Sequence, residues 1–226
     1  MGFIAKCNLC FRHCNISEGS YGFCEIRTCK DGKVIADNYG KLTSIALDPI
    51  EKKPLNRFYP GSMILSVGSY GCNLRCPFCQ NYHISWGDEV ASFKRKATYV
   101  SPAELVRVAE EQTANGNIGV AFTYNEPLIS YEYVLDTAKL LKEKGLKTVL
   151  VTNGMADVET VRELFDHIDA MNIDLKGFTD HYYEDILLGN RKMVMEFIKE
   201  ATPVDTIYHL KSIAEKHLTY VYTGNC

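Results

Sequence analysis

The stretch MILSVGSYGCNLRCPFCQN, residues 63–81, joins an apolar run to a loop with three closely spaced cysteines. The run Met63–Gly68 has the composition of a buried strand, and Cys72, Cys76 and Cys79 follow it with the spacing Cys-x3-Cys-x2-Cys. Three thiolates on one loop can bind three irons of a cubane [4Fe–4S] cluster while the fourth iron stays open for chemistry. A structural zinc site would need a fourth ligand and usually two paired Cys-x2-Cys elements; buried free thiols are the other alternative. The spacing favours the cluster.

From about Ser62 onward, short apolar runs alternate with segments of helical pattern. Each run is almost continuously apolar, which is typical of a strand covered on both faces. Alternation of this kind predicts repeated βα units and a parallel sheet. The predicted strands are residues 63–68, 118–122, 148–151 and 170–173.

Helix boundaries are marked by their capping residues. Ser101, Pro102 and Glu104 form the start of a helix that we expect to end near Gly116. A second helix is predicted from about residue 130 to 144, with Gly145 as its C-terminal stop. Further along we expect a helix near 191–200, a helix with the apolar positions 207, 210 and 214, and a last strand at 219–222.

Polar residues follow four of the predicted strands. The cysteine loop follows the first strand, TYNEP (123–127) the second, TNG (152–154) the third and DLK (174–176) the fourth. A carboxylate after a single strand is most often a solvated turn residue. Because the C-terminal ends of parallel strands meet at one mouth of a barrel, four such groups together predict one functional site.

These motifs, with the string DPIEKKPLNRFYPGS at 48–62 and NIDLK at 172–176, resemble a known family across nearly the whole chain. The chain is similar to the radical S-adenosylmethionine (SAM) protein of the AmmeMemoRadiSam system, a relative of pyruvate formate-lyase activating enzymes. The resemblance implies a partial (β/α)6 barrel at 61–226, preceded by a small Cys-rich β module at 1–60. It also implies reductive cleavage of SAM by a [4Fe–4S] cluster, on an unknown protein or small-molecule substrate, with an external electron donor such as flavodoxin or ferredoxin.

Site residues follow from the same resemblance, position by position. Glu126 would bind the amino group of SAM, and Thr152, Asn153, Asp174 and Lys176 would surround its methionine end. The aromatic residue before the last cysteine would shield the cluster and pack near the adenine, and Phe78 occupies that position. An activase-type cation site would need an acidic residue just before Thr152, and the chain departs from that pattern with Val151.

A second set of cysteines lies near the N-terminus. Cys7, Cys10, Cys14 and Cys24 are spaced Cys-x2-Cys-x3-Cys-x9-Cys. Four thiolates at such distances can close a zinc or iron site, or hold an auxiliary cluster. The segment has little apolar material, so a metal would help it to fold. Ordinary reduced thiols are the alternative reading.

Composition adds constraints on location and partners. Nine cysteines in a chain without a basic-then-apolar leader or a run of about 18 apolar residues favour a reduced, cytoplasmic protein over a disulfide framework. A net charge of −3 gives no basic surface for nonspecific nucleic-acid binding. We also expect no membrane partner.

The sequence departs from the family near residues 200–202. Relatives carry further βα units before the tail, so we expect an internal deletion here and five barrel strands instead of six. Two functions follow from this reading. The chain is either a radical SAM enzyme with an activase-like reaction, or a shortened iron–sulfur binding protein or scaffold with weak catalysis.

Overall fold

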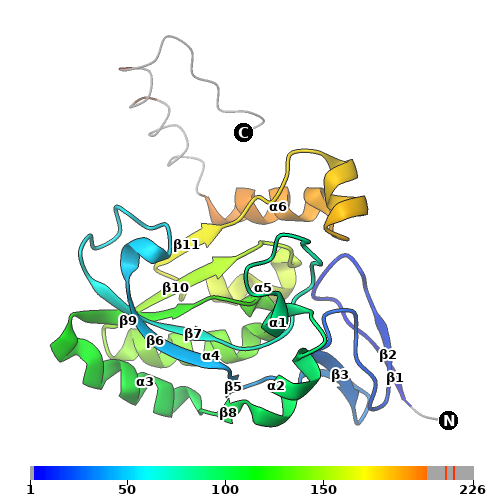
Figure 1. Ribbon diagram of the computed structural model, residues 1–226, viewed down its shortest axis with the longest axis horizontal. Helices are drawn as coiled ribbons and strands as arrows, with labels where there is room; N and C mark the ends of the chain where they lie inside the picture. Colours follow the sequence, from blue (N-terminus) through cyan, green and yellow to red (C-terminus); the bar gives the residue numbers. More distant parts are fainter. Residues whose placement is uncertain (1–2, 203–211, 213–215, 217–226) are drawn as a thin grey trace.

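The computed structural model describes residues 3–202 together with Ser212 and Lys216. Its largest sheet contains five strands in the order β11-β10-β9-β7-β6 (Figure 1). Strand β6 (Ser44–Pro49) is antiparallel to β7. The other four are mutually parallel: β7 (Met63–Gly68), β9 (Asn117–Phe122), β10 (Lys147–Thr152) and β11 (Ala170–Ile173). The predicted partial α/β barrel with parallel strands is confirmed.

The central strands are buried because both of their faces are covered. Ile64 and Leu65 of β7, Val120 of β9, and Val149 and Leu150 of β10 are each at most 3% exposed. Burial of continuous apolar runs supplies the main driving force for this sheet, at about 25 cal/mol per Å² of apolar surface. The side chains of β11 are all partly exposed.

Four longer helices accompany the sheet: α3 (Pro102–Glu111), α4 (Tyr131–Glu143), α5 (Val158–Phe165) and α6 (Arg191–Ala201). Helices α3 and α4 lie along the same side of the sheet in Figure 1 and contact each other. The Ser101 hydroxyl accepts a hydrogen bond from the Glu104 amide at 3.2 Å, which confirms the predicted cap. Gly116 and Gly145 both have left-handed backbone angles after their helices, as expected of C-terminal stops. Sequence reasoning did not predict α5.

The N-terminal region is built from short antiparallel pairs. Strand β1 (Ile4–Lys6) pairs with β2 (Asn15–Ser17), and β3 (Arg27–Lys30) pairs with β4 (Lys33–Ala36). Strand β6 lies within the range expected for the N-terminal module, yet it pairs with β7 in the main sheet. The remaining elements are β5 (Lys41–Leu42), β8 (Thr98–Tyr99), α1 (Tyr82–Ser85), α2 (Val90–Lys96), η1 (Ile50–Lys52), η2 (Gln112–Asn115), η3 (Pro127–Ser130) and η4 (Tyr182–Ile186).

Two predicted C-terminal elements cannot be compared with the structure. The predicted helix with apolar positions 207, 210 and 214 and the predicted strand at 219–222 lie outside the described residues. Across 3–202, 212 and 216, no helix is long and apolar enough to cross a membrane.

Candidate functional site

A pocket with a cavity volume of about 580 Å³ opens at the C-terminal ends of the parallel strands. Its wall contains all three cysteines of the loop after β7 and residues that follow β9, β10 and β11. The structure therefore brings together every residue predicted around cluster and SAM: Cys72, Cys76, Cys79, Phe78, Glu126, Thr152, Asn153, Asp174 and Lys176.

The cysteine loop presents reduced thiols to this pocket. Cys76 is buried, and Cys72 and Cys79 are partly exposed. The Leu74 amide donates a hydrogen bond to Cys72 Sγ at 3.4 Å, and the Cys79 amide donates to the Cys76 carbonyl at 3.1 Å. Burial raises the pKa of the Cys76 thiol to about 11 and that of Cys72 further. In the free chain these groups are thiols, so metal binding must displace their protons.

The donor set fits an iron–sulfur cluster. In the described part of the chain, no three His, Cys, Asp or Glu side chains are close enough to hold one metal ion. In a cubane each thiolate binds a different iron, so the three sulfurs need not converge on one point. Cys72, Cys76 and Cys79, beside a cavity of about 580 Å³, would hold a [4Fe–4S] cluster and leave room for a ligand next to it.

Arg75 fixes the cysteine loop from within, a role that sequence reasoning missed. Its Nη1 donates to the carbonyl oxygens of Cys72 and Leu74, each at 2.9 Å. Its Nη2 donates to the Phe23 carbonyl at 2.6 Å. Since the side chain satisfies backbone oxygens of two distant segments, it joins the cysteine loop to the N-terminal region.

Glu126 follows β9 in the segment that leads to the short helix η3, and it caps that helix. Its carboxylate accepts hydrogen bonds from the Leu128 amide at 3.0 Å, the Thr152 hydroxyl at 2.6 Å and the Asn153 amide at 2.8 Å. Two of these bonds reach Oε1 and one reaches Oε2. A carboxylate has about four acceptor positions, so Oε2 retains one for a ligand.

Electrostatics make Glu126 sensitive to a cationic ligand. The side chain is almost fully buried, and this burial raises its pKa to about 7. Hydrogen bonds from Asn153 and Thr152 and the charge of Lys176 oppose the rise. An ammonium group beside the carboxylate would favour its ionised form.

Asn153 connects the strand ends to the cysteine loop. Its Nδ2 donates to Asn73 Oδ1 at 2.9 Å and lies 3.8 Å from Cys72 Sγ. Its Oδ1 accepts from the Met155 amide at 2.8 Å. The amide is therefore held in one orientation, with its nitrogen toward the first cysteine.

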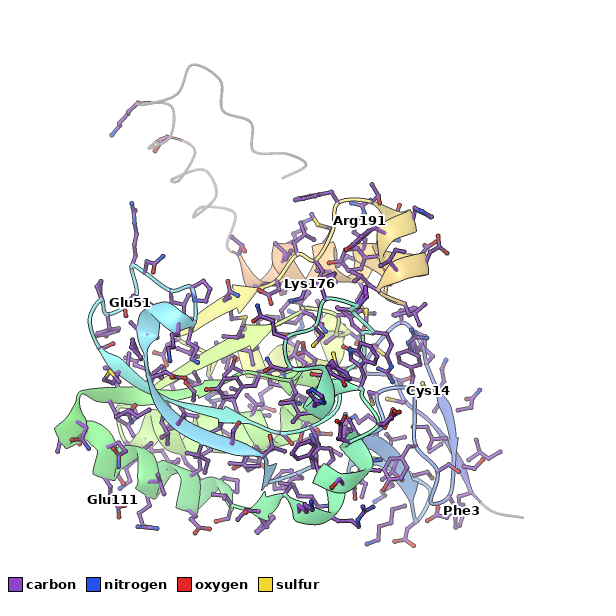
Figure 2. The ribbon with its side chains drawn as sticks, viewed as in Figure 1. Phe3, Cys14, Glu51, Glu111, Lys176 and Arg191 are labelled. Atoms are coloured by element: carbon purple, nitrogen blue, oxygen red, sulfur yellow. The ribbon has the colours of Figure 1, made fainter. Side chains whose placement is uncertain are left out.

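Asp174 and Lys176 form a charged pair at the end of β11. Lys176 Nζ lies 2.6 Å from Asp174 Oδ2, and Figure 2 shows Lys176 beside this end of the strand. Burial lowers the pKa of Lys176, but its hydrogen bond and ion pair with Asp174 outweigh that effect and raise it. The Asp174 amide donates to the Thr152 carbonyl at 2.8 Å, which ties the pair to β10.

Phe78 and Val151 complete the predicted set. Phe78 lines the pocket and is 51% exposed, which leaves apolar surface available beside the cysteines. Val151 also lines the pocket, at the position where a cation site would need a carboxylate. At this position of the pocket wall the chain thus has an apolar side chain instead of the carboxylate that an activase-type cation site would need.

A second charged group at the pocket escaped sequence reasoning. Asp48 accepts hydrogen bonds from Lys52 Nζ at 2.9 Å, Lys53 Nζ at 3.0 Å and the Tyr124 hydroxyl at 2.8 Å. Burial raises the pKa of Asp48, but these three bonds hold it well below its usual range. Lys52, Lys53 and Tyr124 line the pocket. The sequence did offer a signal for these ion pairs, since Lys52 and Lys53 lie four and five positions after Asp48.

The four N-terminal cysteines meet at a different place. Cys7, Cys10, Cys14 and Cys24 line one small cavity of their own, and Figure 2 shows Cys14 on the side of the molecule where β1, β2 and β3 lie. Metal binding there stays a prediction. Cys29 does not line this cavity; its thiol lies 3.4 Å from Glu18 Oε2.

Comparison with known proteins gives related sequences. An uncharacterized protein of Methanocaldococcus jannaschii is 40% identical over 198 residues, covering 87% of this chain and 56% of that protein. The pyruvate formate-lyase-activating enzyme of Clostridium pasteurianum is 27% identical over 149 residues, covering 66% of this chain and 60% of the enzyme. The chain thus spans less than two thirds of the length of either relative.

Among solved structures, QueE from Escherichia coli is 17% identical, with a TM-score of 0.45, over 80% of this chain and 77% of QueE. The family model that describes the radical SAM superfamily matches residues 66–209, which is more than half of the chain. This chain belongs to the radical SAM superfamily, whose members use a [4Fe–4S] cluster and SAM.

Proposed function

We propose that this chain is an enzyme that holds one [4Fe–4S] cluster on Cys72, Cys76 and Cys79 and binds SAM beside it. One observation carries the proposal: three thiolates and the polar ends of three further strands share a single pocket. When bound and reduced by one electron, the cluster supplies the electron that cleaves SAM into methionine and a 5′-deoxyadenosyl radical, which takes a hydrogen atom from the substrate.

Glu126 binds the amino group of SAM in this account. Its unused acceptor position on Oε2 takes a hydrogen bond from the ammonium group, and the ion pair is buried. The Thr152 hydroxyl and the Asn153 amide hold the carboxylate in place through the other bonds at 2.6 and 2.8 Å. A preformed acceptor of this kind costs little reorganisation on binding.

Asp174 and Lys176 surround the methionine end from the neighbouring strand. Lys176 Nζ carries further donors beyond the one directed at Asp174 and can bind the carboxylate of SAM. Phe78 offers its exposed ring to cover the cluster and pack against the adenine. The pocket thereby has a polar side for methionine and an apolar side for the base.

Similarity to activating enzymes supports an activase-like reaction on a protein or small-molecule substrate. The electron would come from an external low-potential carrier such as flavodoxin or ferredoxin, in the cytoplasm, where thiols stay reduced. We further propose that residues 1–60, apart from β6, which belongs to the main sheet, act as a module attached to the barrel at 61–226.

Reductive cleavage of SAM tests the proposal. The full chain, reconstituted anaerobically with iron and sulfide, is mixed with dithionite and SAM, and 5′-deoxyadenosine is quantified by mass spectrometry. The account expects product that depends on both dithionite and the cluster, with a Cys72, Cys76, Cys79→Ala variant as the blank. Cluster and SAM binding with no product above this blank would favour the alternative, an iron–sulfur binding protein or scaffold with weak catalysis.

A further inference from the structure

The N-terminal thiols enclose a cavity that the proposed function does not use. Its free volume is about 10 Å³, against about 580 Å³ for the SAM pocket. A free volume of about 10–15 Å³ accommodates one water-sized particle. The four cysteines contribute to its wall from two separate stretches of chain: Cys7, Cys10, Cys14 and Cys24.

A backbone amide donates a hydrogen bond to one of these thiols. The Arg27 amide donates to Cys24 Sγ at 3.4 Å. Hydrogen bonds to a charged group stabilise that charge. The Leu74 amide makes the same kind of bond to Cys72 in the proposed cluster site, also at 3.4 Å.

The loop that carries three of these cysteines is closed by its own backbone. The Cys7 amide donates to the Cys14 carbonyl at 2.9 Å, and the His13 amide donates to the Cys10 carbonyl at 3.1 Å. Gly22 passes so close to the loop that a Cβ there would lie 3.4 Å from Cys14 Sγ. The backbone thus holds the loop beside the cavity, and its cysteines are free thiols without a disulfide among the described cysteines.

Positive charge also lies at this cavity. Arg12 and Arg27 both line it. Arg27 pairs with Glu132 at 2.6 Å, whereas Arg12 has no carboxylate partner within the described ranges. The Arg12 guanidinium is partly exposed, stacks on the Phe23 ring and donates through Nη2 to the Leu188 carbonyl, while its Nε has no hydrogen-bond partner. Arg12 therefore brings a positive charge without a carboxylate partner to the cavity wall. A tetrathiolate centre with a divalent ion, which carries a net charge of about −2, would compensate it.

We infer that Cys7, Cys10, Cys14 and Cys24 bind a single Zn²⁺ ion in tetrahedral coordination. Four thiolates suit Zn²⁺, with Fe²⁺ as the competing ion of similar chemistry. The cavity of about 10 Å³ suits one ion, whereas the four irons and four sulfides of a cubane would require its wall to open. Since no three such side chains already surround one point within residues 3–202, 212 and 216, the sulfurs must rotate inward as the ion binds.

The ion would hold the cluster loop as well as the N-terminal segment. Asn73, next to Cys72, lines the zinc cavity and accepts the 2.9 Å hydrogen bond from Asn153. Phe23, next to Cys24, lies under the Arg75 guanidinium, 4.0 Å from ring centroid to Cζ, and its carbonyl accepts from the same side chain. The zinc site is therefore a positioning site for the cysteine loop, and this consequence rests on the proposed function.

Metal analysis of the full chain, purified in zinc-containing medium and before iron reconstitution, tests the site. We expect about one zinc per chain, and loss of most of it in a Cys10→Ser, Cys14→Ser variant. A Cys29→Ser variant is the matched control, because Cys29 is buried in the same region outside the cavity. A Cys14→His variant should retain zinc because histidine also binds this ion, which separates lost ligation from lost folding.

Two further measurements separate this inference from the proposed function. A Cys72, Cys76, Cys79→Ala variant should keep its zinc although it cannot assemble the cluster. Co²⁺ in place of Zn²⁺ should give the charge-transfer and d–d bands of tetrahedral thiolate coordination, and these should vanish in Cys10→Ser, Cys14→Ser. Limited proteolysis of that variant should cleave residues 1–30 first, with reduced iron occupancy of the cluster site.

Zinc at background level in the parent chain would overturn the inference. One tightly bound iron without labile sulfide would overturn the choice of zinc. Iron with labile sulfide that persists in the Cys72, Cys76, Cys79→Ala variant would show that the N-terminal cysteines hold a cluster, and would overturn the single-ion site.

Discussion

The Oε1 atom of Glu126, at the end of β9, lies 2.6 Å from the hydroxyl of Thr152, at the end of the neighbouring strand β10. This contact positions a carboxylate in the wall of a pocket that three cysteines also line. Thr152 is the last residue of β10, and Glu126 caps η3 shortly after β9, so neighbouring parallel strands bring the two residues together. The hydrogen bonds from Thr152, Asn153 and Leu128 then set the direction of the remaining acceptor position of the carboxylate.

Replacement of Glu126 by Gln should weaken SAM binding about 10- to 100-fold, since a hydrogen bond to a charged group contributes about 1.5–3 kcal/mol. Titration of SAM into the reconstituted protein, followed by the EPR signal of the reduced cluster, measures the affinity. Cluster content, from iron and sulfide analysis, should stay at the parental level.

Asp169→Asn is the matched control for this change. Asp169 also accepts a backbone hydrogen bond, from the Thr148 amide at 2.9 Å, but it lies at the opposite end of β10. Its replacement should leave the SAM affinity unchanged. Equal affinities of Glu126→Gln and the parent chain would exclude Glu126 as the ligand of the amino group.

The pH dependence of SAM binding should follow the ionisation of Glu126. Burial raises its pKa to about 7 in the free protein, so the fraction of carboxylate falls as the pH is lowered through that value. Only the carboxylate pairs with ammonium, so affinity should fall toward about tenfold per pH unit below the pKa. Binding measured from about pH 8 to about pH 6 should show this in the parent chain and a flat profile in Glu126→Gln. A parallel decline in both proteins would assign the titration to another group.

The hydrogen bonds that Asp48 accepts from Lys52, Lys53 and Tyr124 should contribute more to the stability of the fold than to cluster assembly. Tyr124→Phe removes one hydrogen bond to Asp48 and should lower the free energy of unfolding by about 1 kcal/mol, measured by urea denaturation. The low pKa of Asp48 means that its ion pairs stabilise the fold above the ordinary pKa of an aspartate, and that this contribution is lost as the pH falls toward the folded value.

In Asp48→Asn, the free energy of unfolding should therefore depend less on pH in the acid range than it does in the parent chain. Tyr99→Phe is the control for Tyr124→Phe, because Tyr99 is exposed and does not line the pocket. A loss of stability that is equal in the two tyrosine variants would show that the bond to Asp48 contributes nothing.

Cluster assembly should depend on all three cysteines of the loop after β7. In a Cys72, Cys76, Cys79→Ala variant, the iron and sulfide bound after reconstitution should drop to background, with the far-ultraviolet circular dichroism retained. The sheet keeps its own buried apolar core in that variant. Full cluster absorbance in the variant would place the iron elsewhere.

Local sequence patterns predicted the part of the site that lies at strand ends. Cys72, Glu126, Thr152 and Asp174 each follow an apolar run, and parallel strands bring such positions to one edge whatever the details of packing. The sequence also predicted the helix that starts at Ser101, because its cap is a local interaction.

Local sequence patterns did not predict the contacts between distant segments. Asp48 and Tyr124 meet because β6 pairs antiparallel with β7, and no local signal specifies that pairing. Arg75 reaches the Phe23 carbonyl across 52 positions of sequence. Such contacts depend on tertiary packing, which overrides local propensity.

The EPR spectrum of the reconstituted, dithionite-reduced protein with and without SAM tests the central claim most directly. The account predicts the signal of one [4Fe–4S]⁺ cluster whose g-values shift when SAM is added, because SAM binds the open iron beside Glu126. A cluster signal that SAM at saturating concentration leaves unchanged would contradict the account.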